Sequence, residues 1–200
     1  MLCRIRGFRH LGDTNSWCKM TNFETGTRNT LFWRVPGQSA ASQGRNRRMV
    51  EMVDFFPTLV DLLGLPALPT CEGLDQPPTV DCLQGASYAS EFLPERFALA
   101  EPKSNAFSQW PFPAAYSAPV SFFRVGYTVR TVDGFRLTEY VPYADNKGNW
   151  DDSAGTHDVE LYDYSVDPHE SINLAANTSY AATVQRLKAV LRQQYTADQS

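Results

Sequence analysis

The chain has 200 residues and a formal net charge of −4 at pH 7, and 42% of its residues are apolar while 20% are charged. These fractions are typical of a folded protein with a sizeable core, and the acidic balance offers no basic field for nucleic acid. No apolar run approaches the roughly 20 residues of a membrane-spanning helix, and the first residues lack an apolar stretch of signal-peptide length, so we expect neither a membrane span nor a targeting signal in this chain.

Near the N-terminus, residues 10–24 form a polar run around one lysine, His-Leu-Gly-Asp-Thr-Asn-Ser-Trp-Cys-Lys-Met-Thr-Asn-Phe-Glu. The lysine is Lys19. A lysine in a loop is ordinarily a solvated surface charge, although it can also serve as a point charge against an anion. The residue type alone leaves both roles open.

Two short strands are predicted after this run. Residues 30–35, Thr-Leu-Phe-Trp-Arg-Val, are β-branched and aromatic, and a Pro-Gly pair follows them, which predicts a strand and then a turn. A polar loop leads to residues 49–53, which predict a second short strand.

Residues 54–63 predict a helix. We expect Asp54 to cap it, Pro57 to lie in its first turn, where a missing N–H does no harm, and Gly64 to end it. The helix has a broad apolar face that suits packing on a sheet, formed by Leu59, Val60, Leu62 and Leu63.

Cys71 and Cys82 bracket a short loop that is rich in proline and acidic residues. Such a loop cannot bury enough apolar surface to hold itself, so a local disulfide is its natural constraint, with two free thiols as the alternative. A zinc site is poorly supported, since neither cysteine has a second ligand at metal spacing.

Residues 66–119 are dense in proline and aromatic residues. This composition indicates long ordered loops over a surface rather than a linker, with one short strand at residues 97–100. The aromatic side chains of residues 110–116 could line a sugar-binding cleft, although such side chains more often pack loops.

The C-terminal part predicts a small antiparallel sheet and a helix that covers it. Residues 122–131 and 135–141 alternate between apolar and polar side chains, and an Asp-Gly pair between them predicts a tight hairpin. Residues 159–163 predict a third strand. The last helix, residues 179–195, has an apolar stripe at spacings of three and four: Val184, Leu187, Leu191 and Tyr195.

Four of these segments resemble the sulfatases, most closely the iduronate-2-sulfatase type. Residues 10–24 resemble one family segment, residues 50–66 contain a stretch similar to the family's Val-Asp-x-x-Pro-Thr-Leu, and the iduronate type has a similar short cysteine loop. Residues 160–175, Glu-Leu-Tyr-Asp-Tyr-Ser-Val-Asp-Pro-His-Glu-Ser-Ile-Asn-Leu-Ala, resemble the family's Glu-Leu-Tyr-Asp…Asp-Pro-x-Glu-x-x-Asn-Leu-Ala ending. The resemblance covers about residues 10–195, in the family's order.

The resemblance implies an α/β, alkaline-phosphatase-like sulfatase fold and favours a disulfide between Cys71 and Cys82. Residues 1–66 would be a remnant of the large subdomain, with strands and the helix at 54–63. Residues 67–200 would be the small C-terminal α+β subdomain, with the cysteine loop, an antiparallel sheet and the terminal helix. A sheet separated from its partners exposes open edges and apolar faces, so we expect the missing N-terminal sulfatase portion as a partner.

The same resemblance assigns Lys19 to binding the sulfate that is cleaved, and it assigns no catalytic residue and no metal ligand. The family's metal-binding Asp and His align with Arg6 and Gly7, so the calcium of the full-length family is not expected on this chain. The family's second histidine in this run is Thr14 here, which breaks the polar pair expected there with His10. The nucleophile, a Cys or Ser in a Cys/Ser-x-Pro-x-Arg context that becomes formylglycine, has no counterpart at any cysteine of the chain: Cys3, Cys18, Cys71 and Cys82.

The other histidines and acids give no catalytic pattern. His157 and His169 lie in predicted turns, and we expect both to be ordinary turn residues. Asp145, Asp151 and Asp152 lie in a hydrophilic loop, and no pair has a spacing that demands a carboxylate dyad.

We therefore expect a C-terminal fragment of a sulfatase that is inactive alone, because sulfate ester hydrolysis needs a nucleophile, a metal cation and fixed positive groups, and only the last is present. The expected substrate of the full-length form is iduronate 2-sulfate in glycosaminoglycans. The alternative is a non-catalytic sulfatase relative that binds sulfated glycan or a protein. The cysteine loop and a glycosylation sequon at Asn177 favour a lysosomal or secreted parent.

Overall fold

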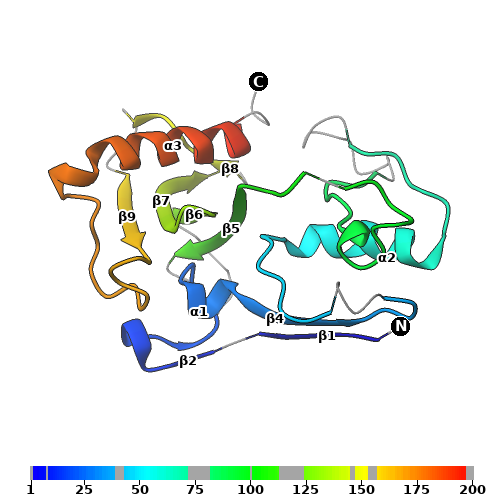
Figure 1. Cartoon of the computed structure of the whole chain (residues 1–200). Coiled ribbons are helices and arrows are strands. Elements are labelled where there is room, and N and C mark those ends of the chain that lie inside the picture. Colours follow the sequence, from blue (N-terminus) through cyan, green and yellow to red (C-terminus); the bar gives the residue numbers. More distant parts are fainter. Residues whose placement is uncertain are drawn as a thin grey trace, which may run out of the picture. The chain divides into compact units, whose positions relative to one another are not determined.

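The computed structural model describes residues 2–7, 9–38, 43–71, 82–99, 101–112, 124–144, 147–152 and 157–196. The chain divides into two compact units, and Figure 1 labels most of their helices and strands. One unit contains Leu31–Ala106 together with Met1–Arg4, and the other contains Ile5–Thr30 and Phe107–Gln199. The division expected from the family, at residues 66 and 67, stays a prediction.

The larger unit is built on a five-stranded sheet. The strand order is β5-β6-β7-β8, and β9 also pairs with β7. The strands are β5 (Asn105–Phe112), β6 (Arg124–Thr131), β7 (Phe135–Ala144), β8 (Lys147–Gly148) and β9 (Asp158–Asp163). The predicted hairpin is confirmed, since β6 and β7 pair antiparallel and Gly134 in the turn has a φ of 97°. The predicted third strand is β9, antiparallel to β7.

A helix covers one face of this sheet (Figure 1). After the short helical turn η6 (Thr178–Tyr180), α3 (Ala181–Thr196) places Leu187 and Leu191 fully inside the core. Burying each such leucine contributes roughly 1.5–3 kcal/mol. The predicted stripe is confirmed, because Val184 and Tyr195 pack against the same core.

Strand β7 divides its side chains between two environments, since successive side chains of a strand point to opposite faces. Leu137 and Val141 belong to the core with α3. Arg136 donates hydrogen bonds to residues of the N-terminal segment of the same unit, at Asn22 and Glu24. One face of β7 therefore anchors the helix, and the other anchors that segment.

The N-terminal segment of this unit consists of short elements. They are β2 (His10–Leu11), the turn η1 (Asp13–Asn15), β3 (Trp17–Cys18) and α1 (Glu24–Thr27). Strands β2 and β3 pair antiparallel, with His10 opposite Cys18. A further two-stranded sheet joins β1 (Leu2–Gly7) and β4 (Asn29–Arg34), and β4 confirms the strand predicted at residues 30–35.

The smaller unit corrects one predicted strand and one predicted cap. Residues 49–53 do not form a strand, because Met52–Asp54 forms the helical turn η3, which leads into α2 (Phe55–Leu63). The carboxylate of Asp54 does not cap α2. It turns back to accept from the N–H of Glu51 at 2.9 Å, and it also accepts from the N–H of Ala86 at 2.9 Å.

Helix α2 confirms the helix predicted at residues 54–63, with Pro57 in its first turn and Gly64 after its last. Its apolar face is narrower than predicted, since Val60 is buried while Leu63 is 57% exposed. The ring of Trp33 packs near three aromatic side chains of this unit, those of Phe55, Tyr88 and Phe92.

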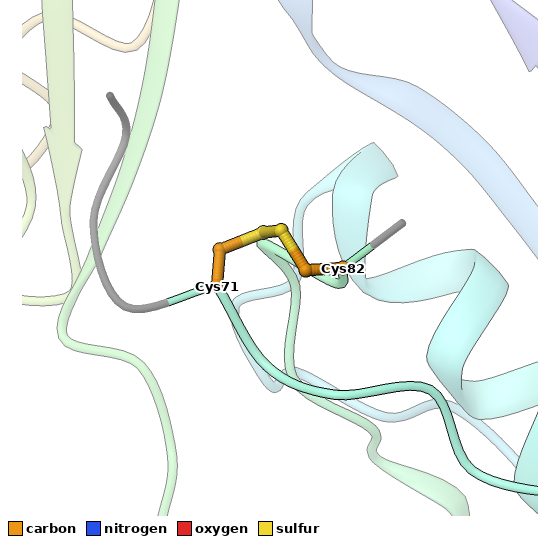
Figure 2. Close-up of a disulfide and its surroundings, with 2 residues drawn as sticks. All are labelled: Cys71 and Cys82. Atoms are coloured by element: carbon orange, nitrogen blue, oxygen red, sulfur yellow. A yellow bond between two sulfur atoms is a disulfide. The ribbon is translucent and has the colours of Figure 1, made fainter. Parts of the chain in front are cut away.

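Cys71 and Cys82 form a disulfide with a Cα–Cα distance of 5.0 Å (Figure 2). This confirms the predicted pair against the alternative of free thiols. Backbone hydrogen bonds support the ends of the loop, from the N–H of Cys71 to the oxygen of Leu83 at 3.0 Å and from the N–H of Leu83 to the oxygen of Pro69 at 2.8 Å.

The strand predicted at residues 97–100 is wrong for the described residues 97–99, which follow a turn closed by the N–H of Arg96 and the oxygen of Leu93 and stay irregular. The next strand begins only at Asn105. Across the described helices, none combines the length and the apolar character that a bilayer crossing requires.

Candidate functional site

His10 is the buried anchor of the β2–β3 hairpin, with 1% of its surface exposed. Its Nδ1 lies 2.7 Å from Asp13 Oδ2, and its Nε2 lies 2.7 Å from Thr21 Oγ1. Because a carboxylate only accepts, Nδ1 donates to Asp13, and in the neutral imidazole Nε2 then accepts from the hydroxyl of Thr21. The expected loss of polar pairing at His10 is thus corrected: Thr14 lies 3.5 Å away, while Asp13 and Thr21 satisfy the ring.

The hairpin also holds its backbone in a costly conformation. Thr14, Asn15 and Cys18 have φ angles of 50°, 53° and 70°, in the left-handed region that non-glycine residues rarely adopt. Asp13 supports the turn by accepting from the N–H of Leu11 at 2.9 Å, and this hydrogen bond holds the pKa of the Asp13 carboxyl below its usual value. The residues before Lys19 therefore have one well-defined arrangement.

Lys19 follows directly and is exposed. Its Nζ donates to the amide oxygen of Asn29 at 3.3 Å, and its ammonium forms no ion pair with any described residue. Such a cation remains available to an anion from solution. The structure therefore leaves the predicted role of Lys19 chemically possible, and that role stays a prediction.

The backbone of Lys19 is fixed by a close approach to Gly26. A Cβ at Gly26 would lie 2.8 Å from the carbonyl oxygens of both Lys19 and Thr21. Real Cβ atoms do not approach oxygen so closely, so this buried position requires glycine. The N–H of Thr21 in turn donates to the oxygen of Lys19 at 2.8 Å.

A largely buried ion cluster, here called the clamp, follows immediately and consists of Glu24, Arg136, Tyr164 and Glu170. The guanidinium of Arg136 donates to the carboxylate of Glu24, and its Nε lies 2.9 Å from Glu170 Oε1. The same Nε donates at 2.8 Å to the hydroxyl of Tyr164, which donates to Glu170 at 2.5 Å.

The clamp balances its charges. Burial alone would raise the pKa of Glu24, but the guanidinium groups of Arg136 and Arg130 outweigh it and hold the pKa below its usual value. Burial raises the pKa of Tyr164, so its hydroxyl stays protonated and keeps its donor role. The buried carboxylate of Glu170, the partly buried one of Glu24, the guanidinium of Arg136 and the phenol of Tyr164 thereby satisfy one another, with Arg130 adding a second positive charge near Glu24.

The clamp joins two runs that the sequence had singled out separately. Glu24 ends the first run and Glu170 belongs to the last, and the N–H of Glu24 donates to Glu170 Oε2 at 2.7 Å. Sequence reasoning missed Arg136, which lies outside both runs. The available signal was a cationic side chain at the second position of the strand predicted at residues 135–141.

A second ion cluster corrects the prediction for His157. This histidine is not an ordinary turn residue, because its side chain is only 3% exposed and its Nδ1 lies 3.0 Å from Glu139 and 3.3 Å from Asp152. Arg192 on α3 contacts both carboxylates, at 2.6 and 2.7 Å, and Lys188 lies 3.0 Å from Glu139. His169 is exposed in a turn, as predicted.

Among the described residues, one group has potential ligand atoms close enough together to hold a metal ion, within 4.8 Å of one another. It consists of Glu139, Asp152 and His157. Arg192 and Lys188 already neutralise these carboxylates, so the cluster is an ion-pair network that fastens α3 to the sheet. The positions aligned with the family's metal ligands do not fit a cation either, since Arg6 carries a positive charge and Gly7 has no side chain.

Cys18 is an exposed free thiol, while Cys71 and Cys82 are oxidised and cannot be nucleophiles. Asn177 is exposed and its Oδ1 accepts from the N–H of Ser179 at 3.0 Å, which leaves its glycosylation a prediction. Asp145 and residues 113–116 of the aromatic segment lie outside the described residues.

Comparisons with known proteins cover most of the chain. No family model matches it. The chain is 27% identical to iduronate 2-sulfatase of Mus musculus over 218 residues, covering 89% of the chain and 38% of that enzyme. It is 27% identical to iduronate 2-sulfatase of Homo sapiens over 202 residues, covering 82% of the chain and 36% of that enzyme.

Among solved structures, that of BT4656 in complex with its substrate D-glucosamine-2-N,6-O-disulfate matches with a TM-score of 0.59 and 24% identity. The match covers 94% of the chain and 33% of that protein. The chain thus spans well under half the length of each of these relatives.

Proposed function

We propose, from the premise that the chain belongs to the sulfatase family and is similar to iduronate 2-sulfatase, that it is a sulfate-binding portion of a protein that hydrolyses sulfate esters. Lys19 is the residue that carries this proposal. It is exposed, it lies in the sulfatase-like run, and its ammonium has no described ion-pair partner.

In this proposal Lys19 acts as a fixed positive charge beside a sulfate oxygen. Charge that is held in place before the reaction stabilises the developing charge of the departing sulfate without reorganisation. Two features support a fixed position for Lys19. Three residues of the β2–β3 hairpin before it have left-handed backbone conformations, and its carbonyl oxygen packs closely against Gly26. The chain's own residues then bind and orient the sulfate group.

The nucleophile and the metal cation of sulfate ester hydrolysis are proposed to come from the part of a full-length sulfatase that corresponds to none of these residues. In the full-length family these are formylglycine and calcium. Neither fits the residues of this chain, since its cysteines lack the required context and Arg6 and Gly7 cannot ligate a cation. We therefore expect the 200-residue chain to release no sulfate from a chromogenic aryl sulfate with calcium present. Turnover above background would overturn this expectation.

A sulfated glycosaminoglycan is the proposed ligand class, with iduronate 2-sulfate as its sulfated sugar. The name of the two curated relatives supports the iduronate type, and the disulfated glucosamine bound to BT4656 supports sulfated sugars more generally. The proposed compartment is the lysosome or the cell exterior, where a disulfide such as that of Cys71 and Cys82 persists.

The test is the binding of a 2-O-sulfated dermatan disaccharide to the purified chain, measured by titration calorimetry or NMR. We expect Lys19→Ala to weaken binding about tenfold or more, because a charge-assisted contact contributes about 1.5–3 kcal/mol. The matched control is Arg186→Ala, which also removes one exposed cation of the same unit. An equal loss of affinity in both variants would show that binding depends only on net charge, and it would contradict the assignment of sulfate binding to Lys19.

A second candidate function is a non-catalytic sulfatase relative that binds sulfated glycan in its own right. The observation that favours it is the disulfide between Cys71 and Cys82, because oxidised cysteines cannot act as nucleophiles and no cysteine has the family's nucleophile context. The β2–β3 hairpin before Lys19 is then a candidate binding element and not part of a catalytic site. Binding of the disaccharide that Lys19→Ala abolishes is expected of both candidates. An absence of binding contradicts both.

A further inference from the structure

Arg136 connects the strand β7 to the backbone that follows Lys19. Its side chain is 3% exposed, and its NH1 donates to the carbonyl oxygen of Asn22 at 2.8 Å. Its NH2 donates to the carboxylate of Glu24. Both acceptors lie within five residues of Lys19, so one buried guanidinium fixes the chain just after the proposed sulfate contact.

The same segment is held from two other directions. The side chain of Asn22 is buried and its Nδ2 donates to the carbonyl oxygen of Gly126 at 3.0 Å. On the other side, Thr21 Oγ1 lies 2.7 Å from the buried ring of His10. The backbone from Lys19 to Glu24 thus lies between the hairpin and the sheet, and Arg136 supplies its charged attachment.

Glu170 shows that this attachment was built at a cost. Its φ of 55° places a non-glycine residue in the left-handed region, and its side chain is nearly fully buried. That conformation directs one carboxylate to the N–H of Glu24 and to Arg136 at the same time. A strained backbone and a buried ion pair are retained where surrounding contacts over-determine them.

We propose that Arg136 is a positioning residue that holds the Lys19 segment in a sulfate-binding conformation. This inference rests on the proposed role of Lys19. An anion that binds a preordered lysine does not have to order the surrounding segment. The entropy cost of binding is therefore smaller, and the affinity is higher.

The geometry requires arginine at this position rather than any cation. The guanidinium uses its Nε toward Tyr164 and Glu170, and its two terminal nitrogens toward Asn22 and Glu24. A lysine ammonium is one point with three donors and cannot reach acceptors along a planar fork. Arg136→Lys therefore keeps the charge and removes the positioning.

A matched control lies on the opposite face of the same strand. Glu139 is fully buried, and the hydrogen-bond and ion-pair partners that it has among the described residues are His157, Lys188 and Arg192, all outside the Lys19 segment. Glu139→Gln should lower the stability of the same unit without loosening residues 19–24. The two variants separate a local positioning effect from a general loss of stability.

The experiment measures amide hydrogen exchange of residues 19–24 and binding of the 2-O-sulfated dermatan disaccharide, in the full chain. For Arg136→Lys we expect exchange in this segment to accelerate at least tenfold and the disaccharide Kd to rise at least tenfold. For Glu139→Gln we expect neither change. Equal changes in both variants, or unchanged exchange in Arg136→Lys, overturn the proposal.

Two further results, an absence of binding and a variant that does not fold, still distinguish the two proposals. If the unaltered chain does not bind the disaccharide, the proposed function fails, while the exchange measurement still tests the positioning. If Arg136→Lys does not fold, Tyr164→Phe replaces it, because this variant keeps Arg136 and removes one hydrogen-bond partner. We then expect about threefold faster exchange in residues 19–24, and unchanged exchange overturns the proposal.

Discussion

At the scale of single residues, Gly26 has the sharpest steric requirement near Lys19. It lies inside α1, where alanine would ordinarily be preferred to glycine by about 1 kcal/mol. The carbonyl oxygens of Lys19 and Thr21 reverse that preference, because they occupy the space of a side chain. The residue is therefore fixed by what packs against it and not by its helix.

Gly26→Ala should destabilise the chain by about 1–3 kcal/mol, the usual cost of overpacking a filled site. The free energy of unfolding in urea measures this, and NMR shifts at residues 19–21 should report the displaced backbone. Thr25→Ala, one position earlier in the same short helix, serves as the control and should cost far less. A Gly26→Ala variant as stable as the unaltered chain would contradict the steric argument.

At the scale of elements, α3 is held to the sheet by two different kinds of contact. Its apolar stripe buries Leu187 and Leu191, and its charged side chains reach Glu139 on β7. Burial alone would raise the pKa of Glu139, but hydrogen bonds from Arg192 and Lys188 outweigh burial and hold the pKa below its usual value. Asp152 behaves alike, since its hydrogen bond with Arg192 lowers its pKa to about 2.

These shifts set the direction of a pH dependence. A carboxyl whose pKa is lower in the folded state than in the unfolded chain stabilises the fold above the unfolded pKa, and this contribution disappears as pH falls through the folded pKa. The contribution of Glu139 should therefore be complete above about pH 4.5 and decline below it. The free energy of unfolding should fall accordingly between pH 6 and pH 3.

Glu139→Gln tests the origin of that decline. At pH 6 the variant should lose about 1.5–3 kcal/mol, because charge-assisted hydrogen bonds of Glu139 with Arg192 and Lys188 are lost while Arg192 keeps its contact with Asp152. Its stability should also vary less with pH in the acid range, because one titrating group is gone. Parallel pH curves for the variant and the unaltered chain would show that other carboxyls cause the decline.

At the scale of the whole molecule, the chain forms two compact units with separate means of stabilisation. The larger unit has an apolar core between α3 and the sheet. The smaller unit relies on α2, an aromatic cluster around Trp33 and the disulfide between Cys71 and Cys82. A bridge that closes a loop of this size stabilises a fold by about 3 kcal/mol through the unfolded state.

Reduction of the disulfide should therefore destabilise the smaller unit selectively. Hydrogen exchange with and without a reducing agent measures this, and we expect faster exchange in α2 while the amides of β6 and β7 keep their protection. The double variant Cys71→Ser, Cys82→Ser should reproduce the effect. Equal acceleration in both units would show that they unfold together.

Local patterns explain which parts of the fold were predictable. The hairpin of β6 and β7 and the stripe of α3 follow from side-chain alternation and spacing within a few residues, and both predictions are confirmed. The strand predicted at residues 49–53 is wrong, because the reciprocal hydrogen bonds of Glu51 and Asp54 stabilise the helical turn η3 and outweigh the strand preference of a largely apolar run. The strand predicted at residues 97–100 is wrong for the described residues 97–99, which follow the turn closed by the N–H of Arg96 and the oxygen of Leu93.

The candidate site divides in the same way. Lys19 and the cysteine pair were identified from residues and their resemblance to sulfatases, and the pair is confirmed. His157 was misjudged because its partner Glu139 lies 18 residues earlier, on the strand β7. Arg136 was not singled out at all, since its acceptor Asn22 lies 114 residues earlier in the chain.

The sequence by itself determined the resemblance of this chain to the sulfatases and the local patterns behind α2, α3 and the hairpin of β6 and β7. Only the tertiary structure decided which charged side chains meet, and so which of them are buried together. The physical reason is that helix and strand patterns depend on neighbours within a few positions, whereas an ion pair depends on distance in space. The clamp at Glu24, Arg136, Tyr164 and Glu170 exists only once β7 and the two sulfatase-like runs have come together.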